Sequence, residues 1–319
     1  MKKSTKKLIR RYALSACFVL VLACGVTGCA GTPKGSEAGT DAPDITMTAL
    51  VAANDVETIL SRHTSMLLEY KTSDGEEVSQ EYTDADYIYQ MMDGTDVLVG
   101  KEDVWQCDEQ DGEKTFYYYW YAMDEKEEAE MRFMPSDYPS PIDNPYTTRE
   151  TIESVQENAD GTLTVITWSN AEDTKEYLET QQVEYPEGDA EQRTEYVVDR
   201  ETLELVSVSS AVVVDGEDAL ASTLNITYDV DQPEALKALA AQIEELQSDE
   251  RTNERTIKLV YDYGTDAEVS YELKADQSYR VIPVTRAGYD YLYSDPEKTE
   301  VFEGSDVLRD VIVYAFSED

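Results

Sequence analysis

The chain has 319 residues, of which 68 are acidic and 26 are Lys or Arg, so its formal net charge is −42 at pH 7. Binding to nucleic acid needs clustered Lys and Arg, so this balance excludes nucleic acid as an expected partner. One histidine and one free cysteine, Cys107, make no usual zinc site, and acids this abundant single out no catalytic carboxylate pair. We therefore predict a protein that is not an enzyme and uses no cofactor or metal.

The first 28 residues have the pattern of an export signal. Six basic residues and no acid stand in residues 1–11, and an apolar run follows over residues 12–28. The segment Val26-Thr27-Gly28-Cys29 resembles the lipobox of bacterial lipoproteins. This resemblance implies removal of the signal peptide, residues 1–28, a diacylglyceryl group on Cys29 and further fatty acylation such as palmitate. We expect Cys29, with Cys24 as the alternative, to hold the chain on the outer face of the bacterial cell membrane.

A tether and a helical segment follow the expected lipid anchor. Residues 29–44 are mostly small or polar and predict a flexible linker. The pattern over residues 47–61 predicts a helix, and Asn54 with Glu57 has capping-box spacing, so either one helix runs through or a second one restarts at Asn54. His63 follows at the junction of helix and strand, and we interpret it as a junction or surface histidine because no Gly-x-Ser-x-Gly nucleophile elbow accompanies it.

Antiparallel hairpins are predicted for most of the remaining chain, because short stretches rich in Tyr, Val and Thr alternate with Asp-Gly turns. Residues 222–230 alternate between apolar and polar side chains, as a half-solvated strand does. Two other stretches, residues 87–92 and 116–121, are apolar on both sides. We predict that their side chains form either ordinary core or the lining of a cavity for an amphipathic ligand, with these ligand-binding candidates: Tyr87, Tyr89, Met91, Phe116, Tyr118 and Trp120.

The segments that follow predict helices at two further places. Residues 124–150 suggest a short acidic helix and a proline-rich loop. Residues 234–247 predict a helix capped by Asp231 or Gln232, with an apolar stripe formed by Leu236, Leu239, Ile243 and Leu246. A polar linker then begins at residue 248. Cys107, the cysteine that remains after cleavage and acylation, is expected to be buried and to form no disulfide.

The order of elements over residues 45–250 resembles the lipoprotein-carrier (LolA/LolB-like) half-barrel superfamily. The resemblance rests on the helix-then-strand pattern of Thr48–Tyr70 and on the strand pattern of Tyr196–Tyr228. It implies a curved sheet whose concave face holds acyl chains or another apolar ligand.

Residues 256–316 resemble the internalin-type B-repeat, a small β-grasp-like module of bacterial surface proteins. The matching segments are Ile257–Tyr263, Gly288–Tyr291, Ser294-Asp295, Phe302 and Asp310–Ala315. The Gly-Trp of that family is absent, and Phe316 stands near the usual place of its terminal Trp. We predict a domain over residues 251–319 with an interaction face formed by Tyr289, Tyr291 and Tyr293.

These patterns predict an α+β fold that is mainly antiparallel β, with a curved half-barrel sheet, flanking helices and a small C-terminal β-grasp-like domain. The predicted function is that of a non-enzymatic cell-envelope lipoprotein whose larger domain, residues 45–250, binds a lipid-like ligand. The alternative is a surface interaction or adhesion protein that recognises envelope proteins or wall polymers. A structural spacer and loose binding of extracellular calcium also stay open.

Overall fold

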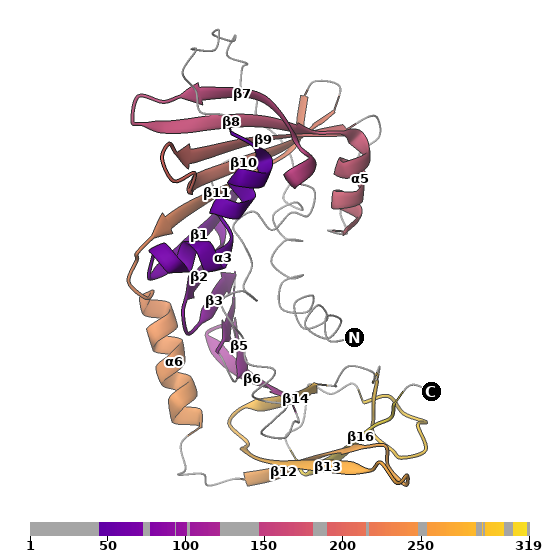
Figure 1. Ribbon diagram of the computed structural model, residues 1–319. Helices are drawn as coiled ribbons and strands as arrows, with labels where there is room; N and C mark the ends of the chain where they lie inside the picture. Colours follow the sequence, from indigo (N-terminus) through magenta and orange to yellow (C-terminus); the bar gives the residue numbers. More distant parts are fainter. Residues whose placement is uncertain are drawn as a thin grey trace. The chain divides into compact units, whose positions relative to one another are not determined.

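Figure 1 shows the computed structural model of the chain. It describes residues 45–72, 77–92, 94–100, 103–121, 147–180, 190–214, 217–247, 254–284, 289, 291–302 and 309–317. The expected signal peptide, Cys29, the tether and residues 124–146 lie outside the described residues. The fold is α+β and mainly antiparallel β, as the sequence predicts. No helix of the described part is both long and apolar enough to cross a membrane.

Contacts divide the described chain into two units, which are treated separately below. We call residues 45–85 and 147–231 the N-terminal unit, and residues 86–121 and 232–317 the C-terminal unit. The predicted boundary between the domains of residues 45–250 and 251–319 stays a prediction.

The N-terminal unit begins with two short helices, α2 (Met47–Ala53) and α3 (Val56–Arg62). The helix therefore restarts, but one residue later than Asn54. Asp55 is the N-cap of α3, and its carboxylate accepts the backbone N–H groups of Glu57 and Thr58. The predicted capping role of Asn54 is wrong because its amide is buried and bonds elsewhere.

Seven strands of the N-terminal unit form an open antiparallel sheet in the order β2-β1-β11-β10-β9-β8-β7. In β8 and β9 every second residue is buried, which is the pattern of a sheet with one covered face. The predicted alternation in residues 222–230 is confirmed, since Leu224 and Ile226 are buried and Thr227 is exposed. The bounds are β1 (Ser65–Thr72), β2 (Glu77–Asp84), β7 (Thr151–Glu157), β8 (Thr162–Ser169), β9 (Ala190–Asp199), β10 (Leu205–Val214) and β11 (Glu217–Tyr228).

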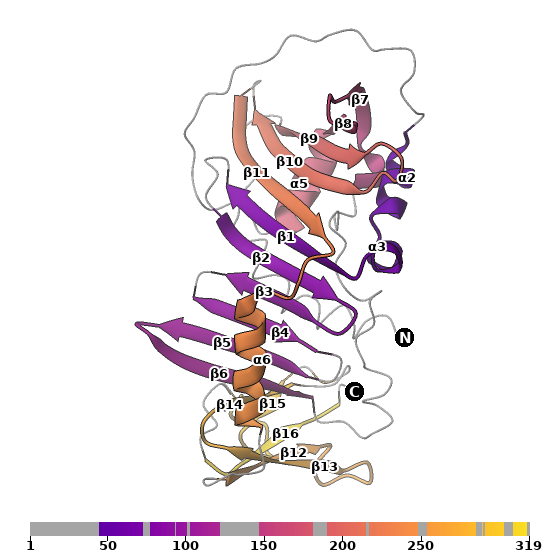
Figure 2. The same cartoon turned by 90° about the vertical axis from the view of Figure 1, so that its left-hand side faces the viewer.

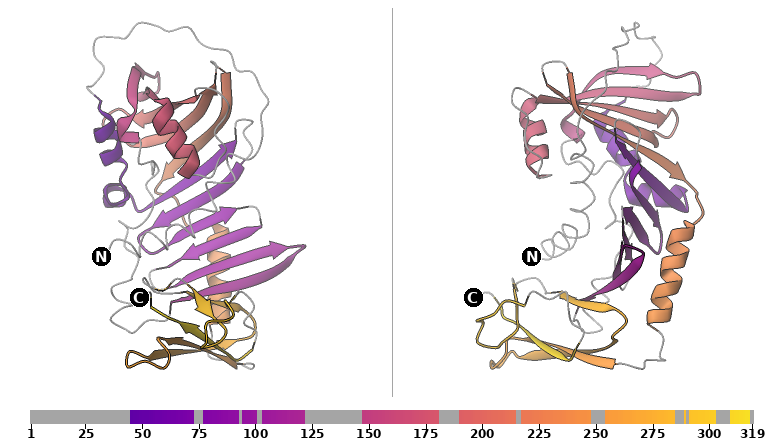
Figure 3. Two further views of the ribbon diagram at one scale, coloured as in Figure 1. Left: turned by 90° about the vertical axis from the view of Figure 1, so that its right-hand side faces the viewer. Right: turned by 180° about the vertical axis from the view of Figure 1, so that it is seen from behind.

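A helix that the sequence analysis did not predict, α5 (Ala171–Thr180), packs against β9 (Figure 3). Asn170 begins it, because its side-chain oxygen accepts the backbone N–H of Asp173. Thr174 on α5 accepts the backbone N–H of Gln192 at 3.1 Å, which ties the helix to the sheet. A single turn of 3-10 helix, η2 (Thr147–Arg149), precedes β7.

The larger group of paired strands in the C-terminal unit has the order β14-β6-β5-β4-β3. A tight turn with positive φ at Asp111 and Gly112 joins β5 to β6, which confirms that Asp-Gly hairpin. Strand β14, from the C-terminal part of the chain, pairs in parallel with β6. The bounds are β3 (Ile88–Met92), β4 (Thr95–Val99), β5 (Val104–Gln110), β6 (Glu113–Tyr121) and β14 (Arg280–Val284).

Helix α6 (Glu234–Leu246) lies across strands β3 to β6 (Figure 2). Its predicted stripe is largely confirmed, because Leu236, Leu239 and Ile243 are buried. Its N-cap is Pro233, which makes no side-chain cap, so the prediction of Asp231 or Gln232 is wrong.

A second, four-stranded sheet completes the C-terminal unit in the order β13-β12-β16-β15. The parallel pairing of β12 with β16 buries Ile257, Leu259, Val313 and Ala315 on its inner face. The bounds are β12 (Glu254–Tyr261), β13 (Val269–Asp276), β15 (Leu292–Tyr293) and β16 (Val311–Ala315).

Candidate functional site

The six predicted ligand-binding residues share one face of the β3–β6 strands. The registers place Tyr89, Leu98, Trp105 and Tyr118 in one row across the four strands. Met91, Asp96, Cys107 and Phe116 form the next row on the same face. Tyr87 stands two residues before Tyr89, and Trp120 two residues after Tyr118, so strand alternation places both on this face as well. The structure therefore brings the predicted set together.

Two of the six candidates are core residues, and the other four are half-buried. Tyr89 is 2% exposed and Trp120 is 8% exposed. The opposite face is buried as well, at Ile88, Val97 and Val104. The stretch 87–92 is therefore buried on both sides at Ile88 and Tyr89, whereas Phe116 to Tyr119 of the other stretch are only half-buried. Cys107 is also buried, and burial raises the pKa of its thiol, which disfavours the reactive thiolate.

An aromatic cluster on this face includes a residue that the sequence analysis missed. Trp105 stacks on Tyr118 at 4.9 Å between ring centroids, and Tyr279 meets Trp105 edge-on at 5.1 Å. Tyr279 immediately precedes β14, so the pairing of β14 with β6 delivers it to the cluster. Arg255 is buried and donates to the backbone carbonyl oxygens of Asp276 and Tyr279, which holds the connection to β14 in place.

The three tyrosines predicted as one interaction face are not brought together. Tyr289 donates its hydroxyl to Asp262 at 2.7 Å and packs on Tyr261, a residue of the buried inner face. Tyr293 stands opposite Tyr314 on the other face of the small sheet. Tyr291 is 59% exposed.

The side of the small sheet that bears Tyr293 carries a group of apolar side chains, and we call this side the outer face. The registers also place Lys258 beside Ile312 and the buried Val260 beside Tyr314 on it. Tyr314 pairs with Tyr293 across β15 and β16, and Val301 bridges to Tyr293 from the next segment. The ring of Tyr263 meets Tyr314 at 5.3 Å, and that of Phe316 meets Tyr293 at 6.0 Å. The outer face is defined by six residues: Tyr263, Tyr293, Val301, Ile312, Tyr314 and Phe316.

The outer face is open to solvent in part, since Tyr293, Tyr314 and Phe316 are half-buried. Tyr263, Val301 and Ile312 are 47%, 49% and 48% exposed. Among the described residues, the large hydrophobic side chains with such exposure are concentrated in the small sheet and its loops, with Val206 as the one elsewhere. Isolated exposed apolar residues are ordinary, but a contiguous group of them marks an interaction surface.

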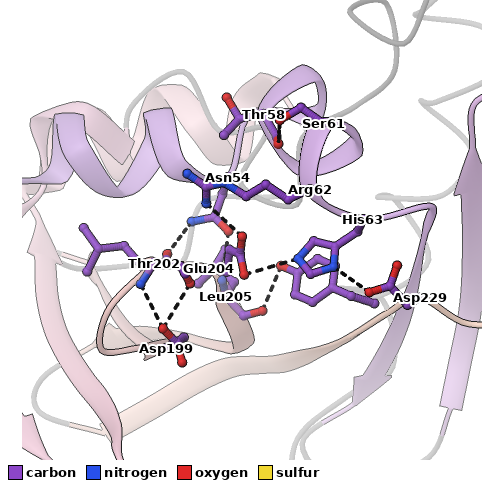
Figure 4. A network of polar contacts seen from close by, with 12 residues as sticks. Asn54, Thr58, Ser61, Arg62, His63, Asp199, Thr202, Glu204, Leu205 and Asp229 are labelled. Carbon is purple, nitrogen blue, oxygen red and sulfur yellow. Dashed lines mark hydrogen bonds and ion pairs between the residues drawn. The ribbon is translucent and has the colours of Figure 1, made fainter.

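A cluster of charged side chains surrounds His63 in the N-terminal unit (Figure 4). His63 follows α3, and its ring stacks on Tyr228 at 4.5 Å. Its Nδ1 lies 2.8 Å from Asp229 Oδ2, and its Nε2 lies 3.3 Å from Glu204 Oε2 without the alignment of a hydrogen bond. The other oxygen of Glu204 accepts a hydrogen bond from Arg62 at 2.8 Å.

The carboxylates around His63 favour its cationic form. Partial burial by itself lowers the pKa of His63, but contacts with Asp229 and Glu204 outweigh it, so the pKa lies above its ordinary value of 6.5. The hydrogen bond from His63 lowers the pKa of Asp229. Both imidazole nitrogens face carboxylates, so neither is directed at a hydroxyl or thiol that it would activate. The arrangement is suited to holding charge between chain segments.

The described residues contain no group of His, Cys, Asp and Glu side chains that could hold a metal ion. The lipidation site Cys29 lies outside the described residues, so its assignment stays a prediction.

Comparison with known proteins gives little further guidance. No family model matches the chain, and no curated protein matches it. A solved structure described as "The complex structure of Pseudomonas aeruginosa MucA/MucB" aligns with 72% of this chain and 76% of that chain, at 10% sequence identity and a TM-score of 0.28. A TM-score this low supports no argument about function.

Proposed function

We propose that this chain is a lipid-anchored protein of the bacterial cell envelope that works by binding a protein partner through the outer face of its C-terminal unit. The observation that carries the proposal is the exposure of Tyr263, Val301 and Ile312 on one face of a small sheet whose other face is core. The proposed role involves no catalysis.

The sequence of the central strand explains why this face is apolar. Residues 311–316 read Val-Ile-Val-Tyr-Ala-Phe, so both sides of the strand carry apolar side chains. Val313 and Ala315 are fully buried on the inner face, whereas Ile312 is exposed on the outer one. A strand that is apolar on both sides is stabilised by cover on both sides. A partner supplies that cover in the proposed complex.

The composition of the outer face indicates the chemistry of the partner. Tyr side chains are common at protein interfaces because they combine a large apolar ring with a hydroxyl that forms hydrogen bonds. Exposed Glu297 and Glu300 lie in the loop that returns to Val301, beside Lys298, whose ammonium stands 4.2 Å from the ring centre of Phe316. With the net charge of −42, this rim favours a partner with an apolar centre and a basic border.

The test compares variants of the exported chain, residues 29–319, anchored on beads and cross-linked in envelope extract. We expect Ile312→Asp to lose a defined cross-linked protein that wild type retains, because the charge cannot be desolvated in an apolar interface. Val206→Asp is the matched control, since Val206 is 44% exposed but lies on β10 of the N-terminal unit. Retention of the same proteins by Ile312→Asp, or equal loss from both variants, contradicts the proposal.

Binding of a lipid-like ligand by the larger domain stays a separate prediction. Of its six candidate residues, Tyr89 and Trp120 are buried in the core, and the other four are half-buried. Native mass spectrometry of the exported chain purified without detergent tests it, and a ligand-free mass in every preparation contradicts it.

A further inference from the structure

His63 connects three segments of the N-terminal unit that are distant in sequence. It lies between the end of α3 and the start of β1. Asp229 follows the last residue of β11, and Glu204 precedes the first residue of β10. The contacts of 2.8 and 3.3 Å therefore bridge from the helix to two strand ends.

The number of protons on the imidazole decides how many of these contacts are favourable. A protonated ring has an N–H on each nitrogen, so it bonds to Asp229 through Nδ1 and forms an ion pair with Glu204 beside Nε2. A neutral ring has one N–H and one lone pair. Because the Nδ1 contact with Asp229 is the shorter and better aligned, the neutral ring keeps its proton there and turns a lone pair toward Glu204.

The surroundings of the ring include one other cation. Arg62, on α3, forms an ion pair with Glu204 at 2.8 Å. Tyr228 covers one side of the ring, and Thr64 donates its backbone N–H and its hydroxyl to Asp229. These contacts do not depend on the proton of His63, so its deprotonation weakens the junction without dismantling it.

We propose that His63 is a pH-sensitive clasp. In its protonated form it joins the end of α3 to the start of β10 through Glu204 and to the end of β11 through Asp229. Deprotonation releases the contact with Glu204. The clasp is independent of the outer face and of the proposed partner.

The sign of the pH dependence follows from the raised pKa of His63. A group that binds its proton more tightly in the folded state contributes stability that is fully present below its unfolded pKa. The ordinary value of 6.5 stands for the unfolded chain. The contribution of the clasp is therefore complete below pH 6.5 and is lost as the pH rises through the folded pKa.

The first experiment is a proton NMR titration of the imidazole. His63 is the only histidine of the chain, so its Cε1–H resonance is unique in an untagged protein. The sample is residues 29–319 carrying Cys29→Ser, which prevents acylation. We expect wild type to titrate above 6.5 and Glu204→Gln to titrate at lower pH than wild type. Glu201→Gln is the matched control, because Glu201 is an exposed acid of the same turn. In this variant the His63 resonance should titrate as it does in wild type.

A second readout follows the conformational consequence. We expect hydrogen exchange of the amides of residues 56–63, corrected for intrinsic rate, to become several-fold faster above the measured pKa in wild type. In His63→Gln this exchange should not change with pH. A wild-type titration at or below 6.5, an unchanged titration in Glu204→Gln, or equal pH dependence of exchange in wild type and His63→Gln overturns the proposal.

Discussion

At the scale of single residues, the buried amide of Asn54 links α2 to the turn before β10 (Figure 4). Its Nδ2 donates to the carbonyl oxygens of Leu50 and Leu203, and its Oδ1 accepts the backbone N–H of Leu205, all at 2.9 Å. Leu203 has a φ of 61°, a left-handed conformation that these contacts help to hold. The side chain therefore fixes the turn before β10 against α2.

We predict that Asn54→Ala lowers the free energy of unfolding by about 3 kcal/mol, because it leaves buried backbone groups without partners. Thr46→Ala, which removes only the exposed cap of α2, is the control and should cost about 1 kcal/mol. Urea denaturation followed by circular dichroism measures both. A loss for Asn54→Ala no greater than that of the control contradicts the prediction.

Glu150 is the residue at which stability should depend on pH in the acidic range. Burial raises the pKa of this carboxyl above its ordinary value of 4.5, and hydrogen bonds from Thr167 at 2.5 Å and Tyr196 at 2.8 Å offset the rise only in part. The folded state therefore holds the proton more tightly than the unfolded state. The stability of wild type falls as the pH rises from 4.5 through the folded pKa.

Glu150→Gln removes this titration, so the variant should gain stability relative to wild type across that window. Scanning calorimetry from about pH 4 to about pH 8 measures the difference. Glu201→Gln serves as the control and should keep a constant offset from wild type. Parallel curves for Glu150→Gln and wild type would show that folding leaves the pKa of this carboxyl unchanged, which contradicts the prediction.

At the scale of elements, the apolar stripe of α6 is buried to different degrees along the helix. Leu239 is 3% exposed, whereas Leu246, in the last turn of the same stripe, is partly exposed. We predict that Leu239→Ala costs about 3 kcal/mol of unfolding free energy, since it removes packed methyl groups and leaves a cavity. Leu246→Ala should cost clearly less, and equal losses in denaturant titrations count against this placement of the helix.

At the scale of the whole molecule, the expected lipid anchor decides where the chain acts. We predict that Cys29→Ser abolishes incorporation of labelled palmitate and moves the protein from the membrane fraction to the soluble fraction, because acyl chains supply the membrane affinity. Cys24→Ser, which alters the alternative cysteine, should leave both unchanged. Unaltered palmitate labelling and fractionation of Cys29→Ser would contradict the predicted lipid anchor and the envelope location that depends on it.

The sequence by itself determined the class of fold and much of its local structure. Periodicity placed the stripe of α6 and the alternation of β11, and Asp-Gly turn chemistry placed the β5–β6 hairpin, because these depend on residues close in the chain. Strand parity grouped the ligand candidates correctly within each of two stretches, but the registers through β4 and β5 decide that the two groups share one face.

Only the tertiary structure decided what each face meets. The pairing of β14 with β6 brings Tyr279 to Trp105 across more than 170 residues, and no local pattern encodes that approach. The same holds for His63, whose partners Glu204 and Asp229 are selected by the order of strands in the sheet. A sequence shows that a side chain is apolar or charged, but the fold decides whether it is buried, paired or left open, because these depend on contacts between distant segments.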